Sequence, residues 1–464
     1  MTDTIEKMLR RHAKLQAELV AIGGALPPRP ATQSGLSESV ADTFGESLAY
    51  IPELKNWVVW DGSRWAVDQS GQIIQVAKLV CRACASKAES DLPSWKAWRS
   101  LEASGKLTGA VAIAATDPRF VRRLGEFDSD PWSLNTAHGL VNLKSGEIHN
   151  NEAGDFCINL AGAAPDFDTE PLAFVQFIRE IADGREDLAG WIIARMAIAL
   201  TGDCSLQDLE IRVGAGANGK SVLASVQSAL MGDYCWTAPP ELLMDSNRRG
   251  GPSPELLNLR GRRLVLVGES GEGDRLDLSL VKRLTGSDSI TARALFSNVM
   301  ATFEPQAKFV LSTNHAPRLA RVDFAIRRRV RLVPFNRRFE GASRDPHILR
   351  KLLEERHAIM GMLVRGAQAY AASMAMPPCA EIDAASGEYL DSEDFIAQWI
   401  DACARLEQAA QTLSGDLYKS FTAWAEREGR KPWTAQAFGR ALSERGIEAV
   451  KPGGQAYREG IVLR

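Results

Sequence analysis

The sequence DLEIRVGAGANGKSVLASVQSAL occupies residues 208–230 and reads as a strand, a glycine-rich turn and a helix. Residues 208–213 are a short β-prone run, and residues 222–230 have helical spacing. Between them, residues 214–221 spell G-A-G-A-N-G-K-S, which matches the P-loop spacing G-x4-G-K-S. Glycines in such a turn let backbone N–H groups point inward and approach a phosphate closely. The full spacing and its flanks argue against a chance glycine turn and predict a nucleoside triphosphate site.

Two side chains of this turn have predicted roles. Lys220 is expected to reach the β- and γ-phosphates, and the Ser221 hydroxyl is expected to bind Mg²⁺ at the positive end of the following helix. ATP and Mg²⁺ are therefore the predicted cofactors. The residues expected to contact ATP are Gly214, Ala215, Gly216, Ala217, Asn218, Gly219, Lys220, Ser221 and Val222.

Two later apolar runs end in polar residues that suit the same chemistry. Residues 263–269, RLVLVGE, are typical of a strand buried on both faces. An acid at that end of an α/β strand lies in the ligand crevice, so Glu269 is the predicted Walker B acid, as metal ligand or as the base that orients water. Residues 308–314, KFVLSTN, predict another buried strand, and its terminal Asn314 is the predicted γ-phosphate sensor.

A basic segment follows the second of these strands. Residues 318–338 hold eight arginines and one acid, Asp323. Such a run is usually a solvated face or a nucleic-acid patch. Its position after the sensor strand favours a third interpretation, in which an arginine crosses a subunit boundary to stabilise charge on the neighbouring γ-phosphate. That interpretation predicts a ring.

Composition limits the class of protein. A chain of 464 residues suggests about three domains. No apolar run approaches the ~18 residues of a membrane span, and the N-terminus is polar rather than a signal peptide, so a cytoplasmic protein without membrane contact is expected. The net charge of −3 excludes a globally basic nucleic-acid binder, so any basic surface must be local. Seven scattered cysteines form no disulfide framework.

The N-terminal third contains packing signals rather than chemistry. Residues 4–22 predict an amphipathic helix, and the Gly/Pro/Ser-rich residues 23–39 predict a linker. Residues 56–67 alternate around a D-G-S turn and predict a β-hairpin. Its tryptophans either stack on bases or are half-buried, and the alternation favours burial. They are Trp57, Trp60 and Trp65.

Further helices and turns are expected before the P-loop. Helical patterns cover residues 75–88 and 95–104, and residues 128–149 predict a compact turn-and-strand unit. Asp128 and Asp130 in that unit form a lone D-x-D, for which a turn is a better explanation than a two-metal site. The strongly helical residues 171–200 suggest a collar that leads into the P-loop strand.

Taken together, these motifs resemble the superfamily 3 helicases, in the branch of phage and plasmid primase-helicases and the poxvirus primase-helicase. The matching elements are GAGANGKS (214–221), RLVLVGE (263–269), VKRLTGSDSITAR (281–293), STNH (312–315) and IRRRVRLVPF (326–335), with upstream similarity in WDGSRW (60–65) and LNTAHGLVNLKSGE (134–147). The resemblance covers roughly residues 45–340 and implies ATP-driven DNA unwinding by a hexameric AAA+-like ring, usually 3′ to 5′ along one strand.

The resemblance also assigns roles to residues. It makes Lys220, Glu269, Asn314 and Arg328 catalytic, with Ser221 and Glu269 on Mg²⁺; the choice among Arg327, Arg328 and Arg329 stays open. A DNA-contacting hairpin is implied at about residues 294–303, where Ser297 and Asn298 replace the cation usual at its tip. The residues expected to contact DNA are Lys282, Arg293, Phe296, Ser297 and Asn298, with Arg440 and Lys451 of the C-terminal module.

The C-terminal part predicts a separate module. Helices are expected at residues 394–409, 414–428 and 434–445, followed by a glycine-rich turn and strand. Helix, helix, helix and β-wing is the order of a winged helix, with Arg440, Arg445, Lys451 and Arg458 on its recognition helix and wing. Such modules bind DNA or protein.

The predicted fold class is α/β with several domains. They are an N-terminal helix and linker (1–44), an α+β domain (45–160), a helical collar (161–205), an AAA+-like P-loop ATPase core (206–340), a helical extension (341–384) and a winged-helix-like domain (385–464). The expected function is that of a replicative DNA helicase of a phage, plasmid or integrated element. Its expected partners are single-stranded and forked DNA, copies of itself in a hexamer, and a separate primase or polymerase. The alternatives are an origin-binding initiator, an NTP-dependent remodeller and a small-molecule kinase.

Overall fold

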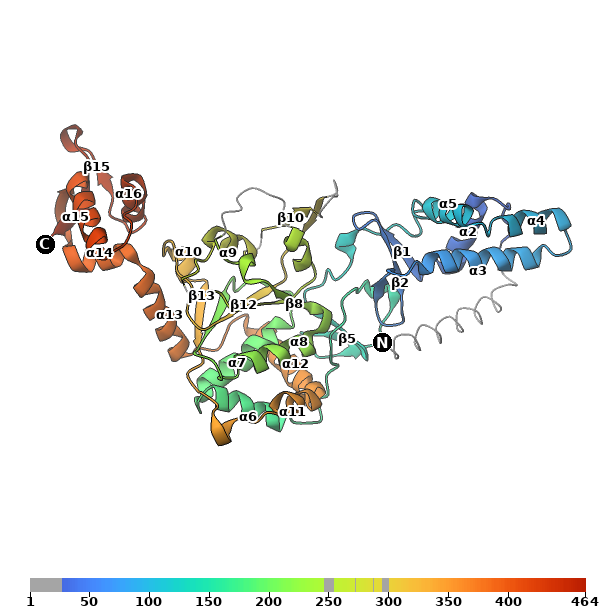
Figure 1. Ribbon diagram of the computed structural model, residues 1–464, viewed down its shortest axis with the longest axis horizontal. Helices are drawn as coiled ribbons and strands as arrows, with labels where there is room; N and C mark the ends of the chain where they lie inside the picture. The colour runs from blue at the N-terminus through green and yellow to red at the C-terminus, as the bar shows by residue number, and fades with distance from the viewer. Residues whose placement is uncertain (1–26, 246–253, 272, 287, 294–299) are drawn as a thin grey trace.

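The computed structural model describes residues 27–245, 254–271, 273–286, 288–293 and 300–464. Figure 1 shows three parts in a row: an N-terminal helical part, a central part built on a parallel sheet, and a C-terminal part joined to it by helix α13 (Ala380–Glu393). The predicted helix at residues 4–22 lies outside the described residues. In the described part of the chain, every helix is too short or too polar to cross a bilayer.

The N-terminal part packs four helices against a small antiparallel sheet. Residues 33–44, predicted to belong largely to a linker, instead form a helix capped by Thr32. The linker prediction was wrong there because Leu36, Val40 and Phe44 share one buried face that packs with the later helices. The elements are α2 (Gln33–Phe44), β1 (Leu48–Ile51), β2 (Asn56–Trp60), β3 (Trp65–Val67), α3 (Gln72–Lys87), α4 (Leu92–Ser100) and α5 (Ser104–Ala114).

The predicted tryptophan hairpin is present. Strands β2 and β3 pair in antiparallel register, with Trp60 opposite Trp65. Trp57 is buried against Tyr50 and Phe120, which confirms the packing interpretation for this ring.

A second antiparallel sheet links the N-terminal part to the central part. Its strands are β4 (Ser133–Thr136), β5 (Gly139–Asn142) and β6 (Ile148–His149). Asp128 accepts hydrogen bonds from the backbone of Ile158 and Asn159, and Asp130 accepts one from the Trp132 backbone at 3.0 Å. Asp130 therefore stabilises a local turn, as the sequence indicated, whereas Asp128 binds the distant backbone of residues 158–159.

The central part is a five-stranded parallel sheet with helices on both faces. The strand order is β13-β7-β12-β9-β8, so strands far apart in sequence become neighbours. One face packs with α6, α7, α8, α11 and α12, and the other with α9, α10 and α13. The strands are β7 (Leu209–Val213), β8 (Cys235–Ala238), β9 (Leu264–Val267), β12 (Lys308–Thr313) and β13 (Val330–Pro334). The helices are α6 (Leu172–Ile181), α7 (Glu186–Ala199), α8 (Lys220–Met231), α9 (Leu278–Leu284), α10 (Phe324–Arg327), α11 (Ile348–Glu354) and α12 (Arg356–Ser373).

The C-terminal part contains three helices and an antiparallel sheet of order β14-β16-β15. The predicted helix over residues 394–409 was wrong in its second half, because α14 ends at Cys403 and residues 404–413 pair with β16 as a strand. Pairing with a distant segment overrides the local helical pattern. The elements are α14 (Phe395–Cys403), β14 (Ala404–Leu413), α15 (Ser414–Arg427), α16 (Ala435–Ser443), β15 (Ala449–Val450) and β16 (Tyr457–Leu463).

Candidate functional site

The predicted site residues meet at one edge of the central sheet. Strand β12 lies between β7 and β9 and runs parallel to both, so the carboxyl ends of all three strands share an edge. Lys220 follows the end of β7, Glu269 that of β9 and Asn314 that of β12. The predicted convergence is confirmed in space: Lys220 Nζ lies 3.3 Å from Asn314 Oδ1, and Asn314 Nδ2 lies 3.2 Å from Glu269 Oε1.

The glycine-rich turn between β7 and α8 has the backbone geometry of a tight cradle. Gly219 is the residue before the helix and has a φ of +86°, in the left-handed region. A Cβ there would lie 2.6 Å from Ile181 Cγ2, so the turn has room for glycine alone. Ala217 is also left-handed, at +49°, although it has a side chain. Such strain is typical of backbone held in place for a ligand.

The ammonium group of Lys220 is buried, and no anion among the described residues contacts it directly. Its side chain donates to the carbonyl oxygens of Gly214 and Thr313 and to Asn314 Oδ1, and the residue is 5% exposed. Burial lowers the pKa of Lys220, and the nearby charge of Glu269 opposes that shift. A buried cation surrounded by neutral acceptors gains from an anion such as a phosphate. The site therefore fits a phosphate group.

Two oxygen donors for a cation also lie at this edge. Ser221 is exposed in the first turn of α8, and Glu269 is exposed beyond β9. In the described residues, no group of three or more His, Cys, Asp or Glu side chains is arranged to hold a metal. Mg²⁺ commonly combines one or two protein oxygens with phosphate oxygens and water, so this sparse donor set fits a metal that arrives with a nucleotide.

Arg328 lies at the opposite edge of the sheet from the turn. Strand β13 pairs with β7 in parallel, with Val330 opposite Leu209 and Pro334 opposite Val213. Arg328 comes before Val330, whereas the turn begins after Val213, so about five strand residues, or roughly 16 Å, separate the two levels. An arginine there cannot reach the turn of its own chain.

The three candidate arginines have different surroundings. Arg327 pairs with Asp391 at 2.8 Å, and Arg329 is 7% exposed and donates to Thr285 Oγ1 at 3.2 Å. Arg328 is exposed and donates to Gln207 Oε1 at 2.7 Å. Among the described residues, no carboxylate pairs with Arg328. These contacts favour Arg328 as the arginine available to a neighbour.

Other arginines of residues 318–338 form ion pairs with acids of the same chain. The N-terminal arginines of the run contact acids of the C-terminal part, with Arg318 on Glu393 and Arg321 on Glu444, each at 3.2 Å. Arg337 pairs with Asp183 at 3.2 Å. The segment is thus mainly a set of ion pairs rather than a continuous nucleic-acid patch.

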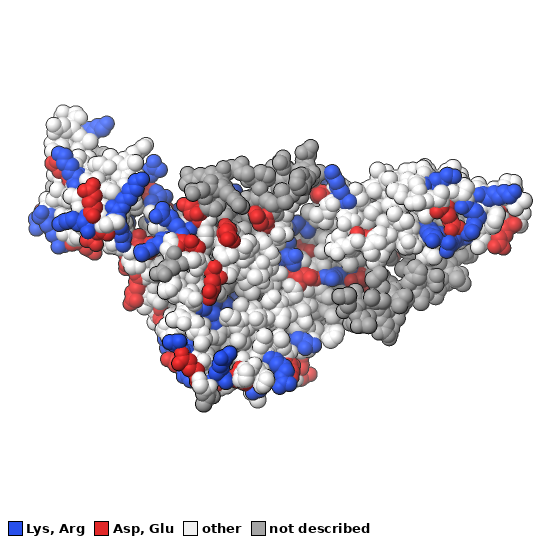
Figure 2. Space-filling model, viewed as in Figure 1, with Lys and Arg blue, Asp and Glu red and all other residues white. Residues whose placement is uncertain are grey.

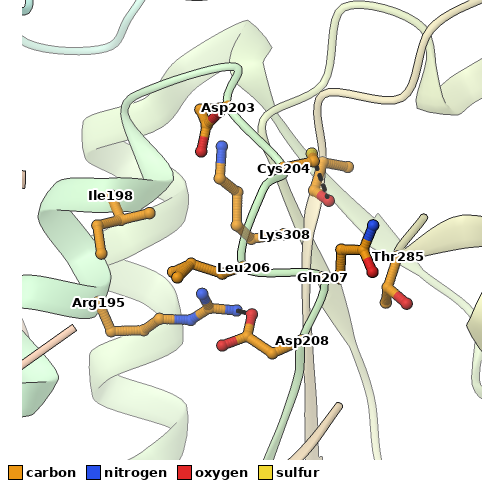
Figure 3. Close-up of a pocket in the computed structure, with 10 residues that line it drawn as sticks. Arg195, Ile198, Asp203, Cys204, Leu206, Gln207, Asp208, Thr285 and Lys308 are labelled. Atoms are coloured by element: carbon orange, nitrogen blue, oxygen red, sulfur yellow. Dashed lines mark hydrogen bonds and ion pairs between the residues drawn. The ribbon is translucent and has the colours of Figure 1, made fainter. Parts of the chain in front are cut away.

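A small cavity of about 10 Å³ lies at the edge of the sheet near Arg328 (Figure 3). Arg195, Asp208 and Lys308 line it, and Gln207 and Thr285 lie side by side at its rim. Such a volume holds about one water molecule, so this is not the nucleotide site. Gln207 and Thr285 contact the candidate arginines, and sequence reasoning missed both. The pairing of β13 with β7 brings Gln207 there, and the packing of α9 against α10 brings Thr285, the C-cap of α9.

Strands β10 (Ile290–Arg293) and β11 (Met300–Phe303) pair in antiparallel register, so the first strand lies before the range of about 294–303 predicted for the hairpin. Its proposed contact residues Phe296, Ser297 and Asn298 lie outside the described residues, and Arg293 ends β10. Lys282 pairs with Asp323 at 2.6 Å, and its contact with DNA stays a prediction. The sequence could not indicate this pairing because the two residues lie on different elements.

In the C-terminal part, the predicted basic residues divide into two groups. Arg440 and Lys451 are exposed, as a contact role requires. Arg458 is buried and donates to Ser443 Oγ at 2.6 Å and to the Gly439 carbonyl, and Arg445 pairs with Asp394. The predicted surface role of Arg445 and Arg458 was wrong, since both guanidinium groups hold the fold. Figure 2 shows basic and acidic side chains mixed over this part.

Comparison with known proteins gives a family match over part of the chain. Residues 37–183 match the family model described as D5 N terminal like. The helicase-named protein L207/L206 of Acanthamoeba polyphaga mimivirus is 28% identical over 233 residues, which are 49% of this chain and 24% of that protein. The helicase-named protein 022R of Frog virus 3 (isolate Goorha) is 26% identical over 230 residues, 46% of this chain and 23% of that protein. The alignments thus span about a quarter of these relatives.

The fold is also similar to solved structures. The apo structure of the NrS-1 C terminal region aligns with a TM-score of 0.53 at 11% identity, covering 93% of this chain and 99% of that one. A second, A form apo structure of the same region gives 0.51 at 11% identity, covering 94% and 100%. The chain is thus similar to the D5 N terminal like family over residues 37–183 and to helicase-named viral proteins over about half of its length, and it shares the fold of the NrS-1 C terminal region.

Proposed function

We propose that the protein is an ATP-dependent DNA helicase that moves along single-stranded DNA as a hexameric ring. The observation that carries the proposal is the division of the site between two edges of one sheet. Lys220, Asn314 and Glu269 form a contiguous set at one edge, and Arg328 is exposed at the other. A second copy that places its Arg328 against the first edge would complete the site.

Each residue has a defined task in this proposal. The turn at residues 214–221 holds the phosphates through its backbone N–H groups, and Lys220 pairs with the β- and γ-phosphates. Mg²⁺ held with Ser221 and Glu269 would offset phosphate charge. Glu269 and Asn314 orient the attacking water, and the neighbour's Arg328 stabilises the charge that develops in the transition state.

Movement along DNA is assigned to the hairpin β10–β11, which enters the channel of the ring. Arg293, Phe296, Ser297 and Asn298 are its proposed contact residues. Tracking of the phosphate backbone needs little base readout, so binding should be sequence-tolerant and salt-sensitive. The C-terminal part is proposed to be a winged-helix module that holds forked DNA through Arg440 and Lys451, with a separate primase or polymerase as a partner.

The first test measures ATP hydrolysis with and without single-stranded DNA. Lys220→Ala should abolish hydrolysis because the phosphates lose their buried cation. Arg328→Ala should also abolish it while ATP binding is kept, since the arginine belongs to the neighbouring site.

Mixing Arg328→Ala protein into wild type is the sharper experiment. In a ring, each variant subunit disables an intact neighbour, so activity falls below the weighted mean of the two proteins. The exposed Arg338→Ala, which removes only a surface pair with Glu340, is the matched control and should leave the rate unchanged. Hydrolysis that ignores DNA, together with a mixture that merely averages, would refute the ring helicase and favour the remodeller or kinase.

A further inference from the structure

The helix that precedes Arg328 is bound at two points to the helix that leads into the hairpin. Asp323 is the N-cap of α10, and its Oδ2 lies 2.6 Å from Lys282 Nζ on α9. Beyond the other end of α10, Arg329 Nε donates to Thr285 Oγ1, the C-cap of α9, at 3.2 Å. Lys282 and Thr285 are three positions apart, so they lie on one face of α9. Both contacts therefore join the same two segments.

These contacts lie over a shared apolar core. Val281 and Leu284 of α9, Ile290 of β10 and Ile326 of α10 are all buried in one cluster. Only residues 285–289 separate the end of α9 from the first strand of the hairpin. Because packed interiors resist deformation, a shift of α10 is transmitted to α9 and to the base of the hairpin.

The ion pair joins two charged groups, one on α9 and one at the N-cap of α10. Burial opposes ionisation of Asp323, but hydrogen bonds from Lys282 and from the Ile326 backbone outweigh it, so the pKa of Asp323 is lowered and the carboxylate stays charged. Arg321 adds a second cation at 3.1 Å. Lys282 thus donates to a partly buried carboxylate within its own chain, and its side chain is 30% exposed.

Arg328 is the exposed residue next to these contacts. It is followed directly by Arg329, and both guanidinium groups donate to the same oxygen, Gln207 Oε1, at 2.7 Å and 3.2 Å. When Arg328 leaves Gln207 for a phosphate on the next subunit, Arg329 and α10 have to adjust with it.

We propose, on the basis of the function proposed above, that the Lys282–Asp323 and Thr285–Arg329 contacts couple the position of Arg328 to the β10–β11 hairpin. In this role Lys282 is a positioning residue rather than a DNA ligand. The coupling makes ATP hydrolysis on one subunit responsive to DNA held by the hairpin of the next.

The test is a double-mutant cycle in the full-length protein, with Lys282→Met, Asp323→Asn and the double variant. Asparagine keeps an acceptor for the cap of α10 while it removes the charge. Each single variant should lower the stimulation of ATP hydrolysis by single-stranded DNA by about 2- to 30-fold, the range reported for coupling residues. The double variant should lose no more than Asp323→Asn alone, because Lys282→Met removes only the Lys282–Asp323 ion pair, which Asp323→Asn already breaks together with the Arg321 pair.

Three further variants separate coupling from folding and from DNA binding. Lys282→Arg should restore stimulation, since a guanidinium also pairs with Asp323. Thr285→Val breaks the second contact without charge and should lower stimulation as well. Lys351→Met on α11, away from the hairpin, removes an ion pair with Asp345 and is the matched control that should leave stimulation unchanged.

Basal hydrolysis and DNA affinity provide the discriminating readouts. Both should stay within about twofold of wild type in all these variants, the scatter expected for independent sites. If Lys282 binds DNA, Lys282→Met instead weakens affinity and reduces its salt slope by about 1, and its effect adds to that of Asp323→Asn; that result overturns the inference. Full stimulation in Lys282→Met and Thr285→Val also overturns it while the helicase proposal stands. A wild type that DNA does not stimulate overturns both.

Discussion

Replacing Arg195 by methionine should destabilise the central part by about 3–5 kcal/mol, the usual effect of breaking a buried ion pair. Arg195 lies on α7, is 2% exposed, and contacts Asp208 at 2.8 Å and Glu210 at 3.3 Å. Glu210 also accepts from Arg212 at 2.6 Å. Two arginines and two carboxylates thus neutralise one another between α7 and β7, the strand that leads into the glycine-rich turn.

The size of the effect follows from charge rather than volume. Methionine keeps much of the arginine stem, so little cavity is left. The loss leaves Asp208 without its partner Arg195 and Glu210 with Arg212 alone, in a buried site, and an uncompensated buried charge is among the costliest single changes in a protein. Combining Arg195→Met with Glu210→Gln restores neutrality and should recover at least about half of the lost stability, since neutral replacement of buried pairs is often tolerated.

Urea unfolding and hydrogen exchange of peptides from β7 and α7 measure this effect. Hydrogen exchange of these peptides reports opening of the central part alone. Urea unfolding of a multidomain chain combines the unfolding of all its parts. Lys351→Met, which breaks an exposed ion pair, is the control and should leave exchange unchanged. If Arg195→Met behaves like this control, or if the double variant loses the sum of the two single changes, the cluster does not stabilise the fold by mutual neutralisation.

Three other predictions concern the turn, the tryptophan hairpin and a buried lysine. Gly219→Ala should abolish ATP binding measured by calorimetry, because its Cβ meets Ile181 and its φ is +86°, whereas Gly387→Ala, with open space around it, should bind normally. Trp57→Ala should lower the free energy of unfolding, measured in urea, by about 3–5 kcal/mol, as for other buried aromatic residues, and should leave DNA affinity unchanged. Unchanged stability with weakened DNA affinity would mean that the ring stacks on bases. Burial lowers the pKa of Lys308 to about 8, below that of an unfolded lysine at about 10.4, so the unfolded chain binds more protons between these values. Its contribution to the unfolding free energy therefore rises with pH across that window. Wild type should gain stability relative to Lys308→Met between about pH 8 and about pH 10, and no relative gain would contradict the shift.

Local patterns in the sequence were sufficient for the elements of the candidate site. The strand, turn and helix at residues 208–230 and the buried strands before Glu269 and Asn314 all form where spacing and residue type predicted them. Such features depend on near neighbours, because side-chain alternation and glycine conformations are set within a few residues. The same patterns failed at residues 404–413, where pairing with β16 replaced a locally plausible helix.

The sequence by itself determined which residues are suited to bind phosphate, cation and water, and in what order they come. The tertiary structure alone decided that β12 lies between β7 and β9, that Arg328 faces away from its own turn, and that Lys282 pairs with Asp323. The physical reason is the range of the interactions. Backbone conformation is encoded locally, whereas strand order and the partner of a charge depend on which distant surfaces pack together when the core forms.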